Sequence, residues 1–141
     1  MKRYLFILLA LTLPATCTFA QEQKEDPIDA AYNACVAKDT SVASISTCAF
    51  TAYKKWEKEM NNAYDKLNRT LKKDKDKLAL KQSQNAWMAY RDAEFTAYDH
   101  MFNHPGCKWC YSRQNGRVEI VRARALQLRG YLEALKSNNK K

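Results

Sequence analysis

The chain contains one long stretch, residues 41–103, in which neither glycine nor proline occurs. In the first half of this stretch, apolar and aromatic residues recur at spacings of three and four, which places them along one face of an α-helix. No segment of the chain shows sustained alternation of apolar and polar residues, so strands are not predicted. The stretch therefore predicts long helices in an all-α fold. The recurring residues are Ala49, Tyr53, Trp56, Met60, Ala63, Leu67 and Leu71.

The second half of the stretch contains a dense aromatic and polar motif at residues 84–92. On a helix, Trp87 and Tyr90 are expected to face the apolar stripe of the preceding helix. Arg91 is expected to pair with a carboxylate such as Glu57 or Asp92. We interpret the motif mainly as a core-facing helix, and the alternative is a polar site beside the core. That site would consist of Gln84, Arg91 and Asp92.

Capping and breaking residues predict where the first helices begin and end. Asp26 followed by Pro27 is typical of a helix start and predicts a short helix over residues 28–35. A second helix is expected from about residue 41 to residue 71. The charged segment that follows predicts a turn, with Asp74 or Asp76 as the cap of a third helix.

The third helix is expected over residues 75–101, because His104-Pro105-Gly106 is a strong stop signal. A last helix is expected over residues 112–136, where apolar residues again recur every three or four positions. Its two glycines weaken it by only about 1 kcal/mol each. The prediction is a small antiparallel bundle of three long helices and a short N-terminal helix, tied by disulfides. A homodimeric coiled coil is the alternative for the long second helix.

The first twenty residues have the features of a secretory signal peptide. Lys2 and Arg3 precede an apolar run that ends at Pro14, and Thr18-Phe19-Ala20 suits signal peptidase. The run is shorter than the roughly 20 residues that span a bilayer. Lipidation at Cys17 is an alternative, which Pro14 disfavours. We therefore predict a periplasmic or secreted protein with a signal peptide over residues 1–20, a disordered segment over 21–27, a helical domain over 28–136 and a basic tail over 137–141.

Removal of the signal peptide leaves four cysteines, and an even number in an exported chain points to disulfides. We expect Cys35 to pair with Cys48 and Cys107 to pair with Cys110, because both loops are short. Closing the first loop would stabilise the fold by roughly 3 kcal/mol on the chain-entropy model. Other pairings remain open.

The sequence Cys107-Lys108-Trp109-Cys110 also matches a C-x-x-C motif. Redox chemistry of the thioredoxin type would need a strand before the motif, and none is predicted. A zinc site that combines this motif with His100 and His104 is a further alternative. In an oxidising compartment we expect a structural disulfide, and no metal or cofactor is predicted.

Charge defines the candidate partners. The chain has 24 basic and 15 acidic residues, and loss of Lys2 and Arg3 leaves 22 against 15, a net charge of +7. Most bases alternate with acids and are interpreted as solvated. The arginines of the last helix could follow an anionic glycan or lipid head group, whereas nucleic acid is not an expected partner of an exported chain. Three of them, Arg113, Arg117 and Arg124, lie along one side, and Arg122 and Arg129 accompany them.

No catalytic motif is present: the chain has no G-x-S-x-G, P-loop, H-E-x-x-H or dinucleotide fingerprint. His100 and His104 lie near a helix end, where histidine favours the helix dipole. Asp92 and Glu94 lie on different faces of one helix and do not make an acid–base pair. We predict no catalytic residue and no enzyme activity.

Three motifs resemble signatures of the LprI-like family of exported bacterial proteins. The first is Glu57-x-x-Met60-Asn61-x-x-Tyr64, the second is Gln84-x-x-Trp87-x-x-Tyr90-Arg91-Asp92, and the third is Arg124-Ala125-x-x-Leu128. Cys35 and Cys48 lie where the family has its first two cysteines, and the resemblance covers residues 35–135. It implies a small helical, disulfide-tied, exported domain and, for one branch, inhibition of lysozyme.

The chain departs from this pattern at three positions. Met60 stands where the family has Leu, and Val121 stands where Thr is common. Phe95 occupies a position that often holds a Cys, which puts the family's usual second disulfide in doubt. Cys107 and Cys110 are expected to replace it locally.

A lysozyme cleft holds two carboxylates, which a protruding loop with cationic side chains can approach. We expect the loop over residues 103–112 to do so, with His104, Lys108, Trp109 and Tyr111 as its binding residues. A disulfide would make this loop rigid and lower the ordering cost of binding. The alternatives are that the loop is only a connector, or that the chain is a cell-envelope module that binds a partner protein or an anionic glycan.

Overall fold

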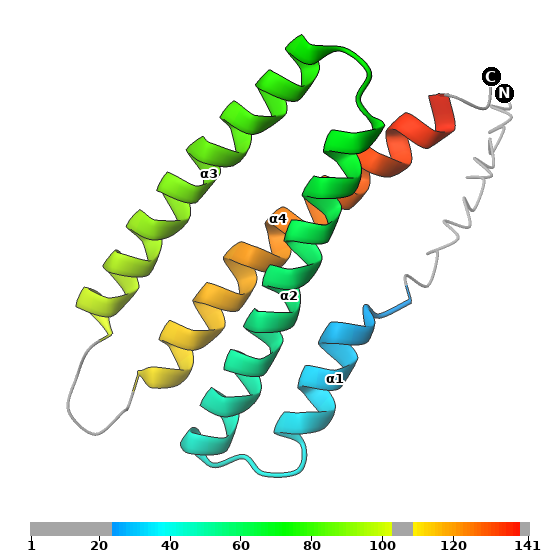
Figure 1. Ribbon diagram of the computed structural model, residues 1–141. Coiled ribbons are helices and arrows are strands. Elements are labelled where there is room, and N and C mark those ends of the chain that lie inside the picture. The colour runs from blue at the N-terminus through cyan, green and yellow to red at the C-terminus, as the bar shows by residue number, and fades with distance from the viewer. Residues whose placement is uncertain (1–23, 103–108, 139–141) are drawn as a thin grey trace, which may run out of the picture.

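The computed structural model describes residues 24–102 and 109–138. These residues form four helices and no strand, which confirms the predicted all-α fold: α1 (Pro27–Val36), α2 (Val42–Thr70), α3 (Asp74–Met101) and α4 (Cys110–Asn138). Consecutive helices run in opposite directions, so that α2 and α4 run in the same direction (Figure 1). None of the described helices is long and apolar enough to cross a membrane.

α1 starts at its predicted capping residue, and α2 starts within the predicted range. The Asp26 side chain accepts a hydrogen bond from the backbone N–H of Ile28 at 2.9 Å, and Pro27 occupies the first helical position. Ser41 caps α2 by accepting from the N–H of Ser44 at 3.3 Å. Both helices therefore start where local backbone chemistry favours them.

The predicted cap of α3 is wrong. Lys73 occupies the N-cap position and makes no side-chain cap hydrogen bond, whereas Asp74 and Asp76 lie inside the first turn. At that position, the two carboxylates face the positive end of the helix dipole. The aspartates therefore favour the helix start through charge and not as caps.

α4 begins at Cys110, before the expected residue 112, and continues to Asn138. Both glycines lie inside this helix, as expected. A β-carbon at Gly116 would lie only 2.6 Å from Cζ of Tyr98. The missing side chain at Gly116 therefore allows the Tyr98 ring of α3 to approach the α4 backbone.

The core lies between α2 and α4, which make most of the contacts between helices. Five residues of the predicted α2 stripe belong to this core, with Trp56 fully buried, so the stripe is used inside one chain. α3 contributes only Leu80 and Gln84 to the buried set, and α1 contributes none. Thus α2 and α4 form the centre, and α1 and α3 flank it. The core residues are Ala49, Ala52, Trp56, Met60, Ala63, Leu67, Leu80, Val118, Val121, Ala125, Leu128 and Leu132.

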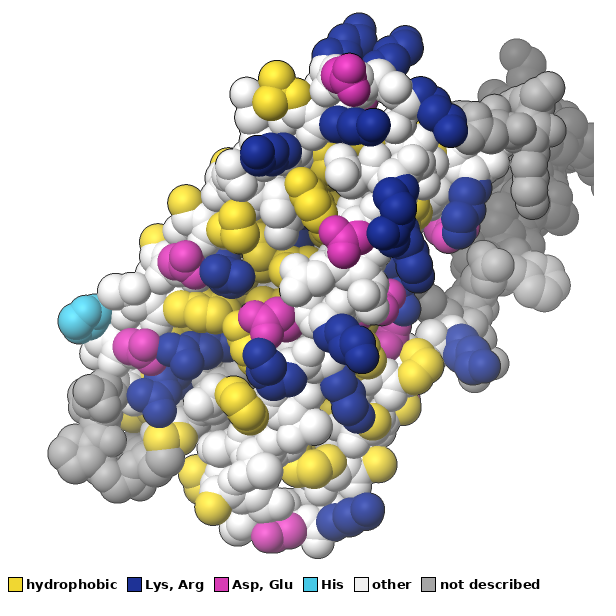
Figure 2. Space-filling view, viewed as in Figure 1, with side chains coloured by type: hydrophobic (Ala, Val, Ile, Leu, Met, Phe, Trp, Pro, Cys, Tyr) yellow, Lys and Arg dark blue, Asp and Glu magenta, His cyan; other side chains and the backbone are white. Residues whose placement is uncertain are grey.

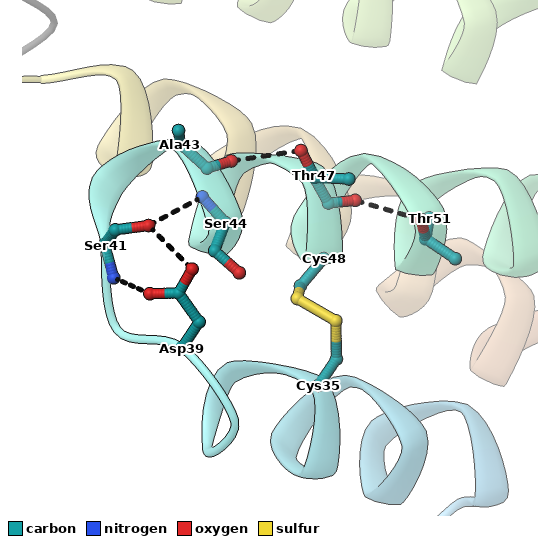
Figure 3. Close-up of a disulfide and its surroundings, with 8 residues drawn as sticks. All are labelled: Cys35, Asp39, Ser41, Ala43, Ser44, Thr47, Cys48 and Thr51. Carbon is teal, nitrogen blue, oxygen red and sulfur yellow. Dashed lines mark hydrogen bonds between the residues drawn. A yellow bond between two sulfur atoms is a disulfide. The ribbon is translucent and has the colours of Figure 1, made fainter.

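A disulfide between Cys35 and Cys48 fixes α1 to the start of α2, which confirms the first predicted pair (Figure 3). The Cα atoms of the two cysteines are 5.8 Å apart. In the connection between the helices, Asp39 accepts hydrogen bonds from the backbone N–H of Ser41 at 2.8 Å and from its hydroxyl at 3.1 Å. Cys107 lies outside the described residues, so its pairing with Cys110 stays a prediction.

Candidate functional site

The three sequence motifs meet around one buried arginine. Arg124 of α4 is 5% exposed, and its Nε donates to Oε1 of Gln84 on α3 at 3.1 Å. The amide nitrogen of Gln84 lies 3.7 Å from Sδ of Met60 on α2. The Arg124 guanidinium also lies 5.9 Å from the ring centroid of Trp87. Residues from all three long helices therefore converge at this point.

The surroundings of Arg124 indicate a structural role. Its Nη2 donates to Ser83 Oγ at 3.1 Å and its Nη1 donates to Gln127 Oε1 at 2.6 Å, so these hydrogen bonds are made with neutral groups. Burial lowers the pKa of Arg124. A buried guanidinium with neutral partners is held by packing and hydrogen bonds, and it contributes to the core of the bundle.

The alternative polar site does not form. Gln84 is buried, whereas Arg91 pairs with Asp92 at the surface, with an N–O distance of 2.7 Å. This pairing confirms Asp92, one of the two expected carboxylate partners of Arg91. The Arg91 guanidinium also lies 5.4 Å from the Trp87 ring centroid. The three predicted polar groups therefore do not converge on a common point.

Tyr90, another signature position, differs from the core role expected of it. Tyr90 is 52% exposed and lines a groove of about 500 Å³ together with α4 residues such as Ile120 and Gln127. The expectation that Tyr90 faces α2 is therefore wrong. Asn61 is exposed, whereas Tyr64 and Trp87 are half-buried against the core.

The arginines of α4 pair with carboxylates of the same chain, which the sequence did not predict. Their partners come from α1, α2 and α3, and the pairs attach the flanking helices to α4. Figure 2 shows the same mixing of basic and acidic side chains over one face of the molecule. The arginine row therefore does not offer a set of free guanidinium groups to an external anion. The N–O distances are 2.6 Å for Arg117–Asp99, 3.8 Å for Arg113–Asp99, 2.7 Å for Arg122–Asp29, 2.6 Å for Arg129–Asp26 and 2.9 Å for Arg129–Glu59.

Of the four predicted binding residues, His104 and Lys108 lie outside the described residues. Trp109 and Tyr111 lie at the start of α4 and are 40% and 43% exposed. Tyr111 turns toward α1 and lines a groove there. The structure therefore places Trp109 and Tyr111 in different surroundings.

Trp109 continues a row of aromatic rings that begins on α3. Its ring centroid is 6.2 Å from that of Phe102, which stacks on Tyr98 at 5.8 Å. We call these three residues the aromatic ridge. The ridge has a fixed base, because Tyr98 packs at Gly116 and Asp99 pairs with arginines of α4. An exposed aromatic side chain on a rigid base is typical of a protein-binding anchor.

The described residues contain no group of three or more His, Cys, Asp or Glu side chains that could hold a metal ion. His100, which belongs to the zinc alternative, is exposed at the end of α3. The other histidine and Cys107 lie outside the described residues.

A family model described as "Lysozyme inhibitor LprI" matches residues 21–128 of the chain. The match spans α1, α2, α3 and most of α4, and it includes all three sequence motifs. Comparison with curated proteins and with solved structures gives no significant match.

Proposed function

This chain belongs to the LprI family of lysozyme inhibitors, and from that premise we propose that it is an exported, non-catalytic protein that binds and inhibits a lysozyme. The family match over residues 21–128 is the observation that carries this proposal. Export agrees with the charged start, apolar run and small residues of the first twenty positions. The protein would then act in the periplasm or outside the cell, where it would meet a lysozyme.

The aromatic ridge is the surface that we propose for the lysozyme contact. Binding hot spots are enriched in Trp and Tyr on pre-organised supports, and Trp109 is the exposed end of the ridge. The family signatures themselves are poorer candidates, because Met60, Gln84 and Arg124 are buried. His104 and Lys108, which precede Trp109 in the chain, are proposed to supply cationic groups to the carboxylates of the lysozyme cleft.

The test is hydrolysis of bacterial cell walls by lysozyme in the presence of the purified mature protein. Inhibition is expected to be saturable. Trp109→Ala is expected to raise the concentration for half-inhibition by about tenfold or more. The control is Leu78→Ala, which removes an exposed apolar side chain (56% exposed) at the far end of α3.

The outcomes distinguish the proposed inhibition from the surface proposed to carry it. Unchanged lysozyme activity at saturating wild-type protein would overturn the proposed function. Equal inhibition by wild type and Trp109→Ala would retain the function but exclude the ridge. Circular dichroism of both variants confirms that they are folded.

A further inference from the structure

An open groove of about 1100 Å³ lies between α1 and α4. α1 contains no fully buried residue, and polar side chains connect it to α4 along the groove. These side chains bridge the two helices at Tyr32–Asn115, Asp29–Arg122 and Asp26–Arg129. The groove is therefore lined by polar side chains that connect the two helices.

Tyrosine and asparagine side chains line one end of the groove. The Tyr32 hydroxyl donates to Oδ1 of Asn115 at 3.3 Å, and Tyr111 lies beside Tyr32 with 43% of its surface exposed. Burial, together with the neighbouring Tyr111, raises the pKa of Tyr32 to about 12. This end therefore offers neutral hydroxyl and amide groups beside an exposed aromatic ring.

Ion pairs neutralise most of the charge at the other end. Arg122 binds both carboxylate oxygens of Asp29, at 2.7–3.0 Å, and Arg129 binds Asp26 at 2.6 Å. The side chains of Asp26 and Asp29 are only 13% and 21% exposed. Both guanidinium groups are already paired with carboxylates, so these four side chains carry no net charge and this end of the groove favours an uncharged ligand.

The lining also disfavours an apolar ligand. Pro27 and Leu126 are the aliphatic side chains among the lining residues, and the remainder are aromatic, amide or charged. Lipid chains and apolar peptide segments need a predominantly hydrophobic surface, which this groove does not provide.

We propose that the α1–α4 groove binds an uncharged oligosaccharide. A sugar ring has a C–H face that packs on an aromatic ring and a rim of hydroxyls that both donate and accept hydrogen bonds. Tyr111 supplies the exposed ring, and Asn115 and Glu119 supply hydrogen-bonding groups on successive turns of α4. The volume is sufficient for a ligand of several rings. This site does not include Trp109 and does not depend on lysozyme inhibition.

The test uses the trimer of N-acetylglucosamine, an uncharged oligosaccharide, titrated into the purified protein without lysozyme. Calorimetry is expected to show saturable binding, and chemical shifts of backbone amides are expected to change in α1 and in residues 111–126. Tyr111→Ala and Asn115→Ala are each expected to weaken binding by about tenfold or more. The matched control is Tyr131→Ala, which removes a tyrosine of the same helix that is 46% exposed and lies outside the groove.

Three results would overturn the proposal. The first is the absence of binding to the wild-type protein, and the second is an equal loss of affinity in Tyr131→Ala. The third is tighter binding of a sulfated oligosaccharide than of the neutral trimer, because this would indicate a site selected by charge. Since lysozyme is absent from the titration, these results are independent of the test of inhibition.

Discussion

The two glycines of α4 lie in one helix but have different surroundings. A β-carbon at Gly116 would lie 2.6 Å from Cζ of Tyr98, whereas one at Gly130 would meet nothing within 4 Å. Alanine favours a helix interior over glycine by about 1 kcal/mol. We therefore expect Gly130→Ala to raise the free energy of unfolding by about 0.5–1 kcal/mol and Gly116→Ala to lower it, as measured by urea denaturation.

The double variant Gly116→Ala/Tyr98→Ala tests the cause. Compared with Tyr98→Ala alone, the double variant is expected to show no further loss of unfolding free energy from the added methyl group, because the ring that this group would displace is absent. A Gly116→Ala variant that is stabilised as much as Gly130→Ala would contradict the close approach of Tyr98.

Arg124 provides a second prediction at the residue scale. Arg124→Ala leaves the buried Gln84 without its partner and removes the packing on Trp87, so it is expected to lower the free energy of unfolding by about 2 kcal/mol or more. The exposed arginine of α2, Arg69, is the control, and Arg69→Ala is expected to cost less than about 1 kcal/mol. Equal effects of the two substitutions in urea denaturation would show that the Arg124 network contributes little.

Asp26 is expected to contribute to the loss of folding stability at low pH. Burial raises the pKa of Asp26. Hydrogen bonds from Arg129 and the Ile28 N–H, together with the charges of Arg129 and Arg122, outweigh this effect. The folded-state pKa of Asp26 is therefore lowered from its ordinary value. Its stabilisation is complete above the unfolded-state pKa and is lost as pH falls through the folded-state pKa. Asp26→Asn is expected to reduce the difference in unfolding free energy between about pH 7 and pH 3.

The pH comparison needs an acid on a different part of the surface. Asp65 is exposed on α2, and Asp65→Asn is expected to leave the acid-induced loss of stability close to that of the wild type. If Asp26→Asn lost as much unfolding free energy between about pH 7 and pH 3 as the wild type, groups other than Asp26 would account for the acid sensitivity.

At the scale of elements, α1 depends on its attachments. It has 10 residues and none is fully buried, and isolated helices of this length are marginal in water. Replacing both Cys35 and Cys48 with Ser is expected to lower the free energy of unfolding by roughly 3 kcal/mol. Hydrogen exchange is expected to show loss of protection in α1, with protection retained in α2 and α4. Parallel loss in all the helices would show instead that the disulfide stabilises the whole core.

Local sequence patterns predicted where the helices lie better than they predicted which side chains contact one another. The stripe of α2 was predictable because its residues repeat within one helix, and Asp26-Pro27 and Ser41 define helix starts by local chemistry. The ion pairs of α4 were not predictable from these patterns. Arg122 and Asp29, for example, are 93 positions apart, and a helical pattern gives the direction of a side chain but not its partner.

The candidate site was predictable to a smaller extent. The exposure of Trp109 and Tyr111 followed from their position beside a helix break, but their separation into a ridge and a groove depends on how α1 and α3 flank α4. Tyr90 shows the same limit. Its helix lies at the side of the central pair, so an aromatic residue with helical spacing remains 52% exposed.

At the scale of the whole molecule, charge predicts the kinetics of the proposed inhibition. Without the proposed signal peptide, the chain has 22 bases and 15 acids, and its net charge of +7 would cause long-range repulsion from a lysozyme of positive charge. We expect the association rate constant, measured by stopped-flow, to rise as salt shortens the Debye length from about 30 Å at 0.01 M to about 8 Å at 0.15 M. A lysozyme of negative charge is the control, for which the rate constant is expected to fall. A fall with the cationic lysozyme would contradict long-range repulsion.

The pairing of α2 with α4 also determines when the chain can form its core. α2 precedes α4 in the chain, so the apolar stripe that contains Trp56 is made before the α4 residues that complete the core. Residues 71–109 must close into a loop before the two helices meet, and this closure has an entropic cost. Until then the apolar stripe of α2 is open to chaperones and to aggregation. A nascent chain that stops before Val118 lacks the α4 residues of the core, so the bundle cannot complete its core until α4 has been made.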